Sequence, residues 1–491
     1  MKIVFVTVGT SLFDRGLAGP REASDDPERI RLLRDAFVVG GDEAEKKMLS
    51  AELASLCRLF SRYPLATGDR LVLLATDSPE GRRAVDVLGQ VLRNHPALDG
   101  AEVETEQPPH WQAHDPVLLA ERGASNLLAA VSRWLAVDLR ARPLFVLTGG
   151  IKLGISVLSQ VSCWSQATAH DGLFFKLEDP GGVFFPPWCF DGGGDGQSLL
   201  PRLPGTVCLR PEVPFTERLR EIAAAMEPPG GGGRAPLTTL VVTSGIGLVR
   251  QKDLLAARFG SPRLADDATW REIDGHWRCR SWRELRAAMR DAPGEQELAD
   301  ASEGVVRQLQ DAWSAGRTRD LPAELAALRS LWAGHPPAPL LRGRLHVLLL
   351  ATDSLTGEYC ASLEAGFLEL LEGIAEVEVE AVPGFHPFGG PPTDGDLFTR
   401  MAELVGAAAA RCKRLLMVPL GGTKLHLPLL TMLATRLHAP LILGHAGLEH
   451  PVVIPWLQQE GGRVRGAGDG VAAAWPELAS FPTVRLEIEG A

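Results

Sequence analysis

Leu71–Gly81 read LVLLATDSPEG, and Val347–Gly357 read VLLLATDSLTG. Two further pairs of blocks flank this repeat in the same order: Ala51–Pro64 with Ala323–Pro336 upstream, and Leu144–Lys152 with Leu416–Lys424 downstream. From upstream to downstream, the three pairs are offset by 272, 276 and 272 residues. Collinear blocks at a nearly constant offset indicate a tandem duplication of one domain, and two related domains can imitate a symmetric homodimer.

The composition is that of a soluble globular protein. The 491 residues suffice for two or three domains, with 45% hydrophobic and 23% charged residues. A net charge of −11 argues against bulk DNA or RNA binding but permits a small anionic ligand in a local pocket. The seven cysteines form no CxxC pair, no signal peptide precedes the first apolar run, and no stretch has the roughly 18 apolar residues of a membrane span. We therefore expect a cytoplasmic protein without a membrane partner.

A Pro- and Gly-rich linker at 227–236 separates the two repeats, because its composition cannot hold a helix or a strand. It predicts one domain at 1–226 and a second at 237–491. The second domain carries an insertion around 251–321, which is either a small helical lid or a solvent-exposed embellishment.

Short β-branched runs alternate with amphipathic helical stretches in both repeats, beginning with Ile3–Val8 and Leu240–Thr243. Continuous apolar runs of this length are typical of buried parallel strands. The pattern predicts an α/β fold of two tandem Rossmann-like domains with parallel sheets. We expect the domains to pack as a pseudo-two-fold dimer.

Ligands of parallel α/β sheets bind at the carboxyl ends of the strands. Three motifs are expected at such ends in each repeat. In the first repeat they are Gly9, Thr10 and Ser11; Asp77 and Ser78; and Gly149 and Gly150 with Lys152. In the second they are Gly245, Ile246 and Gly247; Asp353 and Ser354; and Gly421, Gly422 and Thr423 with Lys424. Glycines let the backbone approach an anion, and the lysines add positive charge.

Each motif also has a purely structural interpretation. The Gly pairs can permit tight turns, Asp77 and Asp353 can be helix N-caps, and the lysines can be solvated. Arg329 and His335 fit a loose ribonuclease pattern, but the first repeat has Cys57 and Tyr63 there, which favours chance. The sequence lacks a P-loop, a dinucleotide fingerprint, zinc-ligand spacing and a nucleophile elbow, so no metal or cofactor is expected.

Five blocks together resemble the CARF domain, the CRISPR-associated Rossmann fold, in the branch that includes standalone ring nucleases. They are VTVGTSL at Val6–Leu12, SAELASL at Ser50–Leu56, ATDSPEG at Ala75–Gly81, LTGGIK at Leu147–Lys152 and FFKLEDPGGVFFPP at Phe174–Pro187. The resemblance covers nearly all of the first repeat and most of the second. It implies a cyclic oligoadenylate, expected as cyclic tetra-adenylate, bound between the repeats. This ligand is the second messenger of type III CRISPR systems.

The resemblance also implies cleavage without metal, in which a ribose 2′-OH attacks the adjacent phosphodiester and leaves a 2′,3′-cyclic phosphate. It assigns the scissile phosphates to Lys152 and Lys424, and a ribose or phosphate oxygen to Ser11. The other motif residues would contact the ligand. The second repeat has Ile246 and Gly247 in place of Thr10 and Ser11, so one half-site is expected to be weaker or binding-only.

The duplication implies a functional pseudo-dimeric monomer, with a higher oligomer left open. Two other functions remain as alternatives. One is a non-catalytic cyclic-oligoadenylate sensor or sponge. A more distant one is a GT-B glycosyltransferase, which also has two Rossmann domains but rarely such similar halves.

Overall fold

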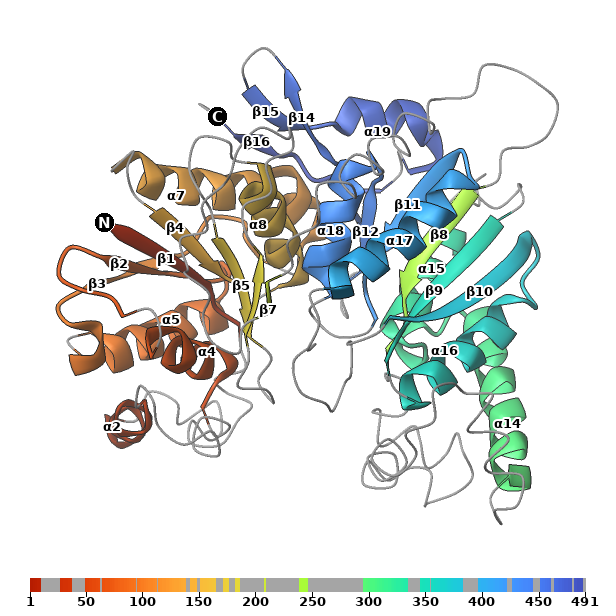
Figure 1. Cartoon of the computed structure of the whole chain (residues 1–491), viewed down its shortest axis with the longest axis horizontal. Coiled ribbons are helices and arrows are strands. Elements are labelled where there is room, and N and C mark those ends of the chain that lie inside the picture. The colour runs from red at the N-terminus through yellow and green to blue at the C-terminus, as the bar shows by residue number, and fades with distance from the viewer. Residues whose placement is uncertain are drawn as a thin grey trace. The chain divides into compact units, whose positions relative to one another are not determined.

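The computed structural model describes residues 1–9, 27–37, 49–61, 64–93, 95–112, 114–137, 142–147, 151–164, 171–175, 182–185, 207–208, 238–245, 295–333, 345–353, 355–382, 396–421, 426–444, 451–460, 463–478 and 481–488. The chain forms two compact units (Figure 1). Unit 1 comprises Met1–Pro211, Leu457–Gly468 and Thr483–Ala491, and unit 2 comprises Glu212–Trp456 and Asp469–Pro482. The predicted linker at 227–236 lies outside the described residues.

The sheet of unit 1 has seven strands. Their order is β3 (Glu102–Glu106), β2 (Arg70–Leu74), β1 (Lys2–Thr7), β4 (Arg142–Val146), β5 (Asp171–Phe175), β6 (Gly182–Phe185) and β7 (Val207–Cys208). Neighbours from β3 to β5 pair in parallel, β6 is antiparallel to β5, and β7 is parallel to β6. After Lys2, every residue of β1 is buried, as expected of a central strand covered on both faces.

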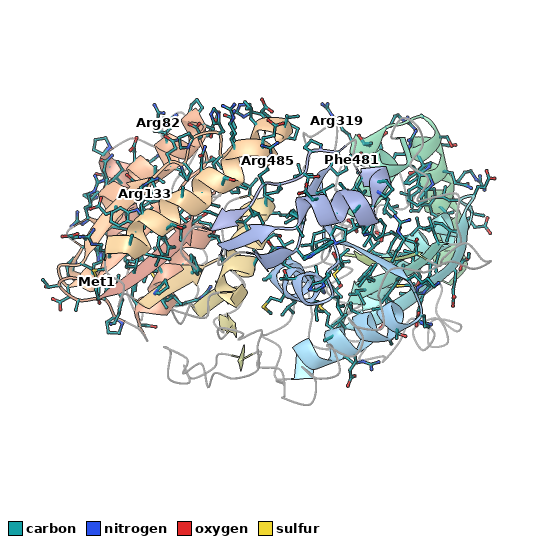
Figure 2. The ribbon with its side chains drawn as sticks, turned by 90° about the horizontal axis from the view of Figure 1, so that it is seen from above. Met1, Arg82, Arg133, Arg319, Phe481 and Arg485 are labelled. Atoms are coloured by element: carbon teal, nitrogen blue, oxygen red, sulfur yellow. The ribbon has the colours of Figure 1, made fainter. Side chains whose placement is uncertain are left out.

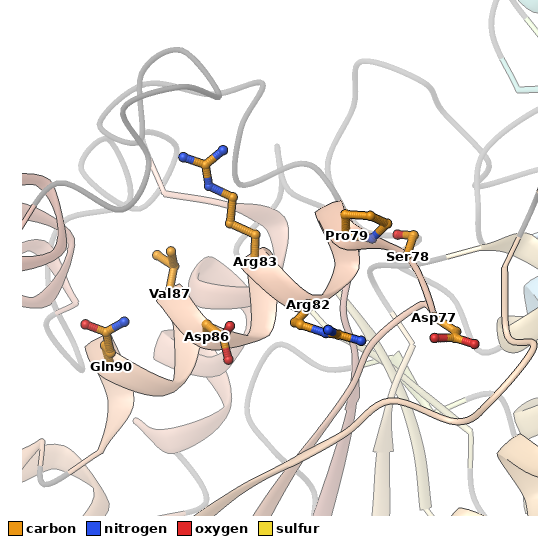
Figure 3. A pocket seen from close by; sticks show the side chains of 8 residues that line it. All are labelled: Asp77, Ser78, Pro79, Arg82, Arg83, Asp86, Val87 and Gln90. Atoms are coloured by element: carbon orange, nitrogen blue, oxygen red, sulfur yellow. The ribbon is translucent and has the colours of Figure 1, made fainter.

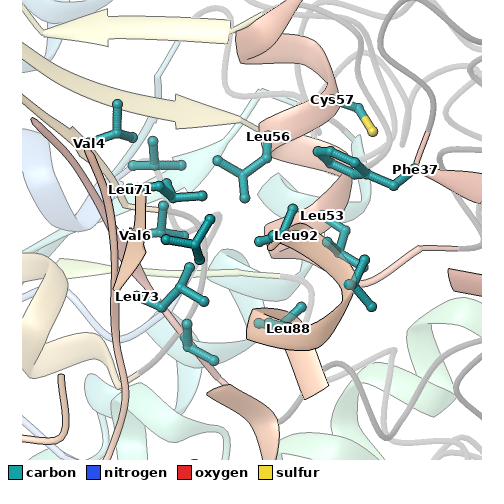
Figure 4. Packing of buried hydrophobic residues seen from close by; sticks show 14 of the residues in the cluster. Val4, Val6, Phe37, Leu53, Leu56, Cys57, Leu71, Leu73, Leu88 and Leu92 are labelled. Atoms are coloured by element: carbon teal, nitrogen blue, oxygen red, sulfur yellow. The ribbon is translucent and has the colours of Figure 1, made fainter. Parts of the chain in front are cut away.

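Helices cover both faces of this sheet (Figure 1). The helices α4 (Ala51–Phe60) and α5 (Pro79–Leu92) lie on one face, and α7 (Ala124–Val137) and α8 (Lys152–Trp164) lie on the other. On the first face, Val4 and Val6 belong to one buried cluster with side chains of α4, α5 and α2 (Pro27–Ala36) (Figure 4). The shorter elements are η3 (Pro96–Leu98), α6 (Pro116–Leu118) and the π-helical turn η4 (Leu119–Gly123).

The sheet of unit 2 has six strands. Their order is β10 (Ile374–Val382), β9 (Leu345–Thr352), β8 (Thr238–Thr243), β11 (Arg414–Val418), β12 (Leu441–Leu443) and β13 (Val452–Ile454). All neighbours are parallel except β12 and β13. The helices and helical turns of this part of the chain are α14 (Glu295–Ser314), η6 (Thr318–Asp320), α15 (Ala323–Ala333), α16 (Leu355–Leu368), α17 (Asp396–Ala410), α18 (His426–Arg436), α19 (Gly468–Ala474) and η8 (Pro476–Leu478).

The two sheets share one strand order. Position by position, β3-β2-β1-β4-β5-β6 corresponds to β10-β9-β8-β11-β12-β13, and in both series only the last pair is antiparallel. The first strand of each repeat is central, and its carboxyl end is flanked by the ends of the second and fourth strands. The predicted α/β fold with parallel sheets is therefore confirmed.

The last part of the predicted insertion packs into the core of unit 2. Trp313 of α14 makes edge-to-face contacts with Trp332 of α15 and Phe367 of α16, at centroid distances of 5.6 and 5.3 Å. In unit 1, α2 packs against α5 in the corresponding way. The described residues 295–321 are therefore part of the repeated fold, whereas residues 251–294 lie outside the described chain.

A small antiparallel sheet near the C-terminus belongs to unit 1. It consists of β14 (Leu457–Glu460), β15 (Arg463–Gly466) and β16 (Glu487–Ile488). Arg485, labelled in Figure 2, lies two residues before β16. The Arg485 N–H donates to the Ala120 carbonyl at 3.0 Å, and the Ser125 hydroxyl donates to the Arg485 carbonyl at 2.7 Å. These bonds join residues 483–491 to unit 1, and the pairing of β15 with β16 joins residues 457–468 to it as well, although both segments were expected in the second domain.

Candidate functional site

A buried glutamate holds the turn that follows the first strand of unit 1. The Gly9 N–H donates to Glu52 Oε1 at 2.9 Å, and Glu52 is fully buried. Ser50 caps α4 by accepting from the Leu53 N–H at 3.2 Å, and this start of the helix brings Glu52 to the turn. The carboxylate thus occupies the carboxyl edge of the sheet, where the sequence predicts a ligand.

Unit 2 repeats this arrangement with Glu324 of α15. The Gly245 N–H donates to Glu324 Oε1 at 3.3 Å, and Glu324 is buried. A Cβ on Gly421 would lie 2.8 Å from the same oxygen and would collide with the Thr243 carbonyl oxygen. Glu324 therefore contacts two of the predicted glycine turns, those after β8 and β11, and brings them together.

Glu52 and Glu324 are absent from the predicted site. The signal for them was present, because the two AELA blocks place a glutamate at the same position of both repeats. A charged residue in the first turn of a helix is ordinarily a solvated residue that favours the helix dipole. Glu52 and Glu324 differ from such solvated residues because both are buried.

The two repeats differ in what lies beside this glutamate. In unit 2, Glu364 of α16 is fully buried next to Glu324 and Ser244. Burial and the Glu324 charge raise the pKa of Glu364 well above its ordinary value. By the alignment of the repeats, Leu88 and Val8 occupy these two positions in unit 1, and both lie in its apolar core. The polar cluster is therefore particular to unit 2.

Asp77 anchors a loop at the end of β2. The His110 N–H donates to Asp77 Oδ2 at 2.8 Å, and the Asp77 N–H donates to the Trp111 carbonyl at 2.6 Å. His110 has a φ of 62°, a left-handed conformation that few residues other than glycine adopt. Trp111 packs so closely on α8 that a Cβ on Gly154 would lie 2.8 Å from its ring. The loop thus packs between the carboxyl end of β2 and the first turn of α8.

The N-cap of α5 is Ser78, which accepts from the Gly81 N–H at 3.0 Å. The interpretation of Asp77 as the N-cap is therefore wrong, because its carboxylate is directed to the loop instead. A cavity of about 490 Å³ opens here, lined by Asp77, Ser78, Pro79, Arg82, Arg83, Asp86, Val87 and Gln90 (Figure 3). Gln107 accepts from Arg82 Nε at 3.1 Å, and its amide donates to the Thr76 and Ser78 carbonyls. Arg82 and Arg83 lie here beside a helix N-terminus, but Asp77 and Asp86 line the same cavity, so its formal charges balance.

Asp77→Ala is expected to destabilise unit 1 by about 1.5–3 kcal/mol, since the His110 N–H loses a charged acceptor. Thermal unfolding measures the loss, and hydrogen exchange should accelerate in residues 107–112. Asp86→Ala removes an exposed carboxylate from the same cavity and should stay within about 0.5 kcal/mol of wild type. Equal stability of the two variants would show that Asp77 does not hold the loop.

Of the predicted site residues, the structure describes Gly9, Asp77, Ser78, Lys152, Gly245, Asp353 and Gly421. Lys152 is the first residue of α8 and is half-buried, and half-buried Asp353 directly follows β9. The predictions for Thr10, Ser11, Gly149, Gly150, Ile246, Gly247, Ser354, Gly422, Thr423 and Lys424 fall outside the described residues.

Within the described ranges, no group of three or more His, Cys, Asp or Glu side chains is placed to hold a metal ion. The helices described in those ranges include none with the length and apolar character needed to cross a membrane.

Part of the chain matches a known family. Residues 47–180 match the model of a family described as CRISPR-associated protein (Cas_APE2256). This supports a CRISPR-associated protein. The match runs from α4 to β5 and includes Glu52, Asp77, Ser78 and Lys152, but not Ser11 or any of the second repeat. None of the curated proteins compared with the chain matches it.

Proposed function

We propose that this protein binds a cyclic oligoadenylate, expected as cyclic tetra-adenylate, and cleaves it without metal. The products would be linear with a 2′,3′-cyclic phosphate, and cleavage would switch off type III CRISPR signalling. One observation carries the proposal. In each repeat a buried glutamate accepts from the N–H of the glycine after the first strand, Gly9 or Gly245, at the sheet edge where α/β folds bind ligands. Two like half-sites suit a ring with two-fold symmetry, so one chain would be the functional unit.

The chemistry requires alignment and charge stabilisation more than it requires a strong base. A ribose 2′-OH must lie in line with the phosphorus and its leaving oxygen, and negative charge develops on the phosphate oxygens. Lys152 begins α8, so its charge adds to the partial positive charge of a helix N-terminus. Lys424 is its counterpart in the second repeat, and Ser11 would position the attacking ribose.

Incubation of the protein with radiolabelled cyclic tetra-adenylate in EDTA tests this function. We expect linear products that carry a 2′,3′-cyclic phosphate. The matched control is the Lys152→Ala/Lys424→Ala variant, which should bind and cleave the ring more weakly. Absence of both binding and cleavage by wild type would refute the proposal and reopen the glycosyltransferase alternative.

A sensor that binds the ring without cutting it is the second candidate. It is favoured by Ile246 and Gly247, which replace the polar Thr10 and Ser11 in the second repeat. Retention of intact ring by wild type in the same assay would establish the sensor and exclude the ring nuclease.

A further inference from the structure

Glu364 is a buried acid that the proposed reaction does not use. It lies in α16, where both of its carboxyl oxygens are buried and the Ser244 hydroxyl is the hydrogen-bond donor that acts on them among the described residues. The Glu324 carboxyl and the Ser244 hydroxyl both interact with it, and the Ser244 hydroxyl is also buried. A buried carboxylate with one neutral donor beside a second carboxylate is strongly disfavoured in the protein interior.

Protonation of Glu364 resolves this conflict. The neutral acid can donate its proton to the Glu324 carboxylate, and the pair then shares one proton and one negative charge. Glu324 itself accepts from the Gly245 N–H and contacts Gly421. A continuous chain of contacts thus runs from Glu364 through Glu324 to the two glycine turns of the second repeat.

We propose that Glu364 is a positioning residue for the half-site of the second repeat, and that it keeps Gly245 and Gly421 in place only while it is protonated. This inference rests on the proposed function. Loss of the proton to solvent leaves two buried carboxylates that repel each other and adds negative charge near an anionic ligand. The half-site of the first repeat lacks this protonatable pair, because Leu88 and Val8 stand in place of Glu364 and Ser244.

The groups around Glu364 set the direction of the pH effect. Glu324 of α15 supplies a neighbouring charge and Ser244 a hydroxyl. The strands β9 and β10 and the helix α14 also pack against α16. His346 of β9 pairs with Glu378 of β10 at 3.2 Å, and the charged residues Glu303, Arg307 and Asp311 of α14 are exposed. Because burial raises the pKa of Glu364, its contribution to stability is present below the ordinary Glu value of 4.5 and is lost as pH rises through the raised pKa.

Binding of fluorescent cyclic tetra-adenylate between pH 5 and 9 tests the inference. Wild-type affinity should fall with rising pH by about 5- to 150-fold, the usual span of coupling between two sites. Glu364→Gln should bind as wild type does at low pH and keep that affinity at high pH, because its amide always donates and never ionises. Ser244→Val/Glu364→Leu, which copies the first repeat, should also lose the pH dependence. Glu369→Gln, an exposed control just beyond α16, should follow wild type. A pH dependence equal in wild type and Glu364→Gln overturns the inference.

Hydrogen exchange of the Gly245 amide separates this inference from the proposed function. After correction for the intrinsic rate, wild type should lose protection as pH rises, and Glu364→Gln should not. If no ring binds at any pH but Gly245 protection behaves this way, the ring-nuclease function fails and the proton-dependent turn stands. Equal Gly245 protection in the two proteins at every pH refutes the positioning role.

Discussion

Replacing Ser11 with alanine should slow cleavage of labelled cyclic tetra-adenylate about 100- to 1000-fold and change its binding little. The hydroxyl is expected to align the attacking 2′-OH, which is a contact made in the transition state. Removal of one such contact typically costs about 2.7–4 kcal/mol of activation free energy. Single-turnover cleavage with enzyme in excess measures the chemical step, and equilibrium binding of the intact ring measures affinity.

The two repeats supply the control for this experiment. Gly247 occupies the position of Ser11 in the second repeat, so cleavage should occur mainly at the phosphates held by the first. Lys152→Ala and Lys424→Ala should weaken binding as well as cleavage, because each removes a full positive charge. Wild-type cleavage by the Ser11 variant, with normal binding and cutting by both lysine variants, would mean that the Gly-Gly-x-Lys motifs are structural turns.

Gly421→Ala should destabilise unit 2 by about 1–3 kcal/mol, a drop in Tm of about 2–12 °C for a unit of this size. The new Cβ would collide with the Thr243 carbonyl oxygen and lie 2.8 Å from Glu324 Oε1. A backbone carbonyl cannot rotate away, so β11 or the turn after β8 must shift. That shift would also separate Glu324 from the Gly245 N–H, so ring binding should weaken in parallel.

Gly366→Ala is the matched control for Gly421→Ala. Gly366 lies in α16, and a Cβ there meets nothing within 4 Å. Alanine should therefore stabilise the helix by about 0.5–1 kcal/mol. Differential scanning calorimetry of both variants measures the two opposite shifts. If the Gly421 variant melts at the wild-type temperature, the methyl group does not clash with the Thr243 carbonyl oxygen and this prediction is wrong.

The sequence predicts the architecture well because the duplication repeats its local signals. The buried runs that begin each repeat become central strands. The ATDS block directly follows β2 in the first repeat and overlaps the end of β9 in the second. The alternation of strands and helices predicts parallel strands joined by helical crossovers. These features are determined by residues that are close together in the sequence, so the sequence alone predicts them. The alternation does not by itself give the reversal of strand order, in which β4 pairs with β1 and β11 pairs with β8.

The contacts that build the site depend on tertiary structure and were harder to predict. Glu52 lies in α4, which is buried from Glu52 to Phe60, and its burial beside Gly9 distinguishes it from a surface acid. Asp77 has the composition of an N-cap, but the loop at His110 takes its carboxylate and leaves Ser78 to cap α5. Similarly, nothing local in 457–468 and 483–491 indicates that these segments pack with the first unit.

Those two C-terminal segments make the chain impossible to divide with one cut. The polypeptide leaves unit 1 after Pro211, returns at Leu457, leaves again at Asp469 and returns at Thr483. In terms of connectivity, unit 2 is inserted into unit 1, as in a domain-insertion fusion. A fragment that ends at the linker would lack β14, β15 and β16, and the complementary fragment would carry them without the α7 region that binds them. Protease nicking at the linker should therefore yield two pieces that co-purify, because one unit is built from both of them.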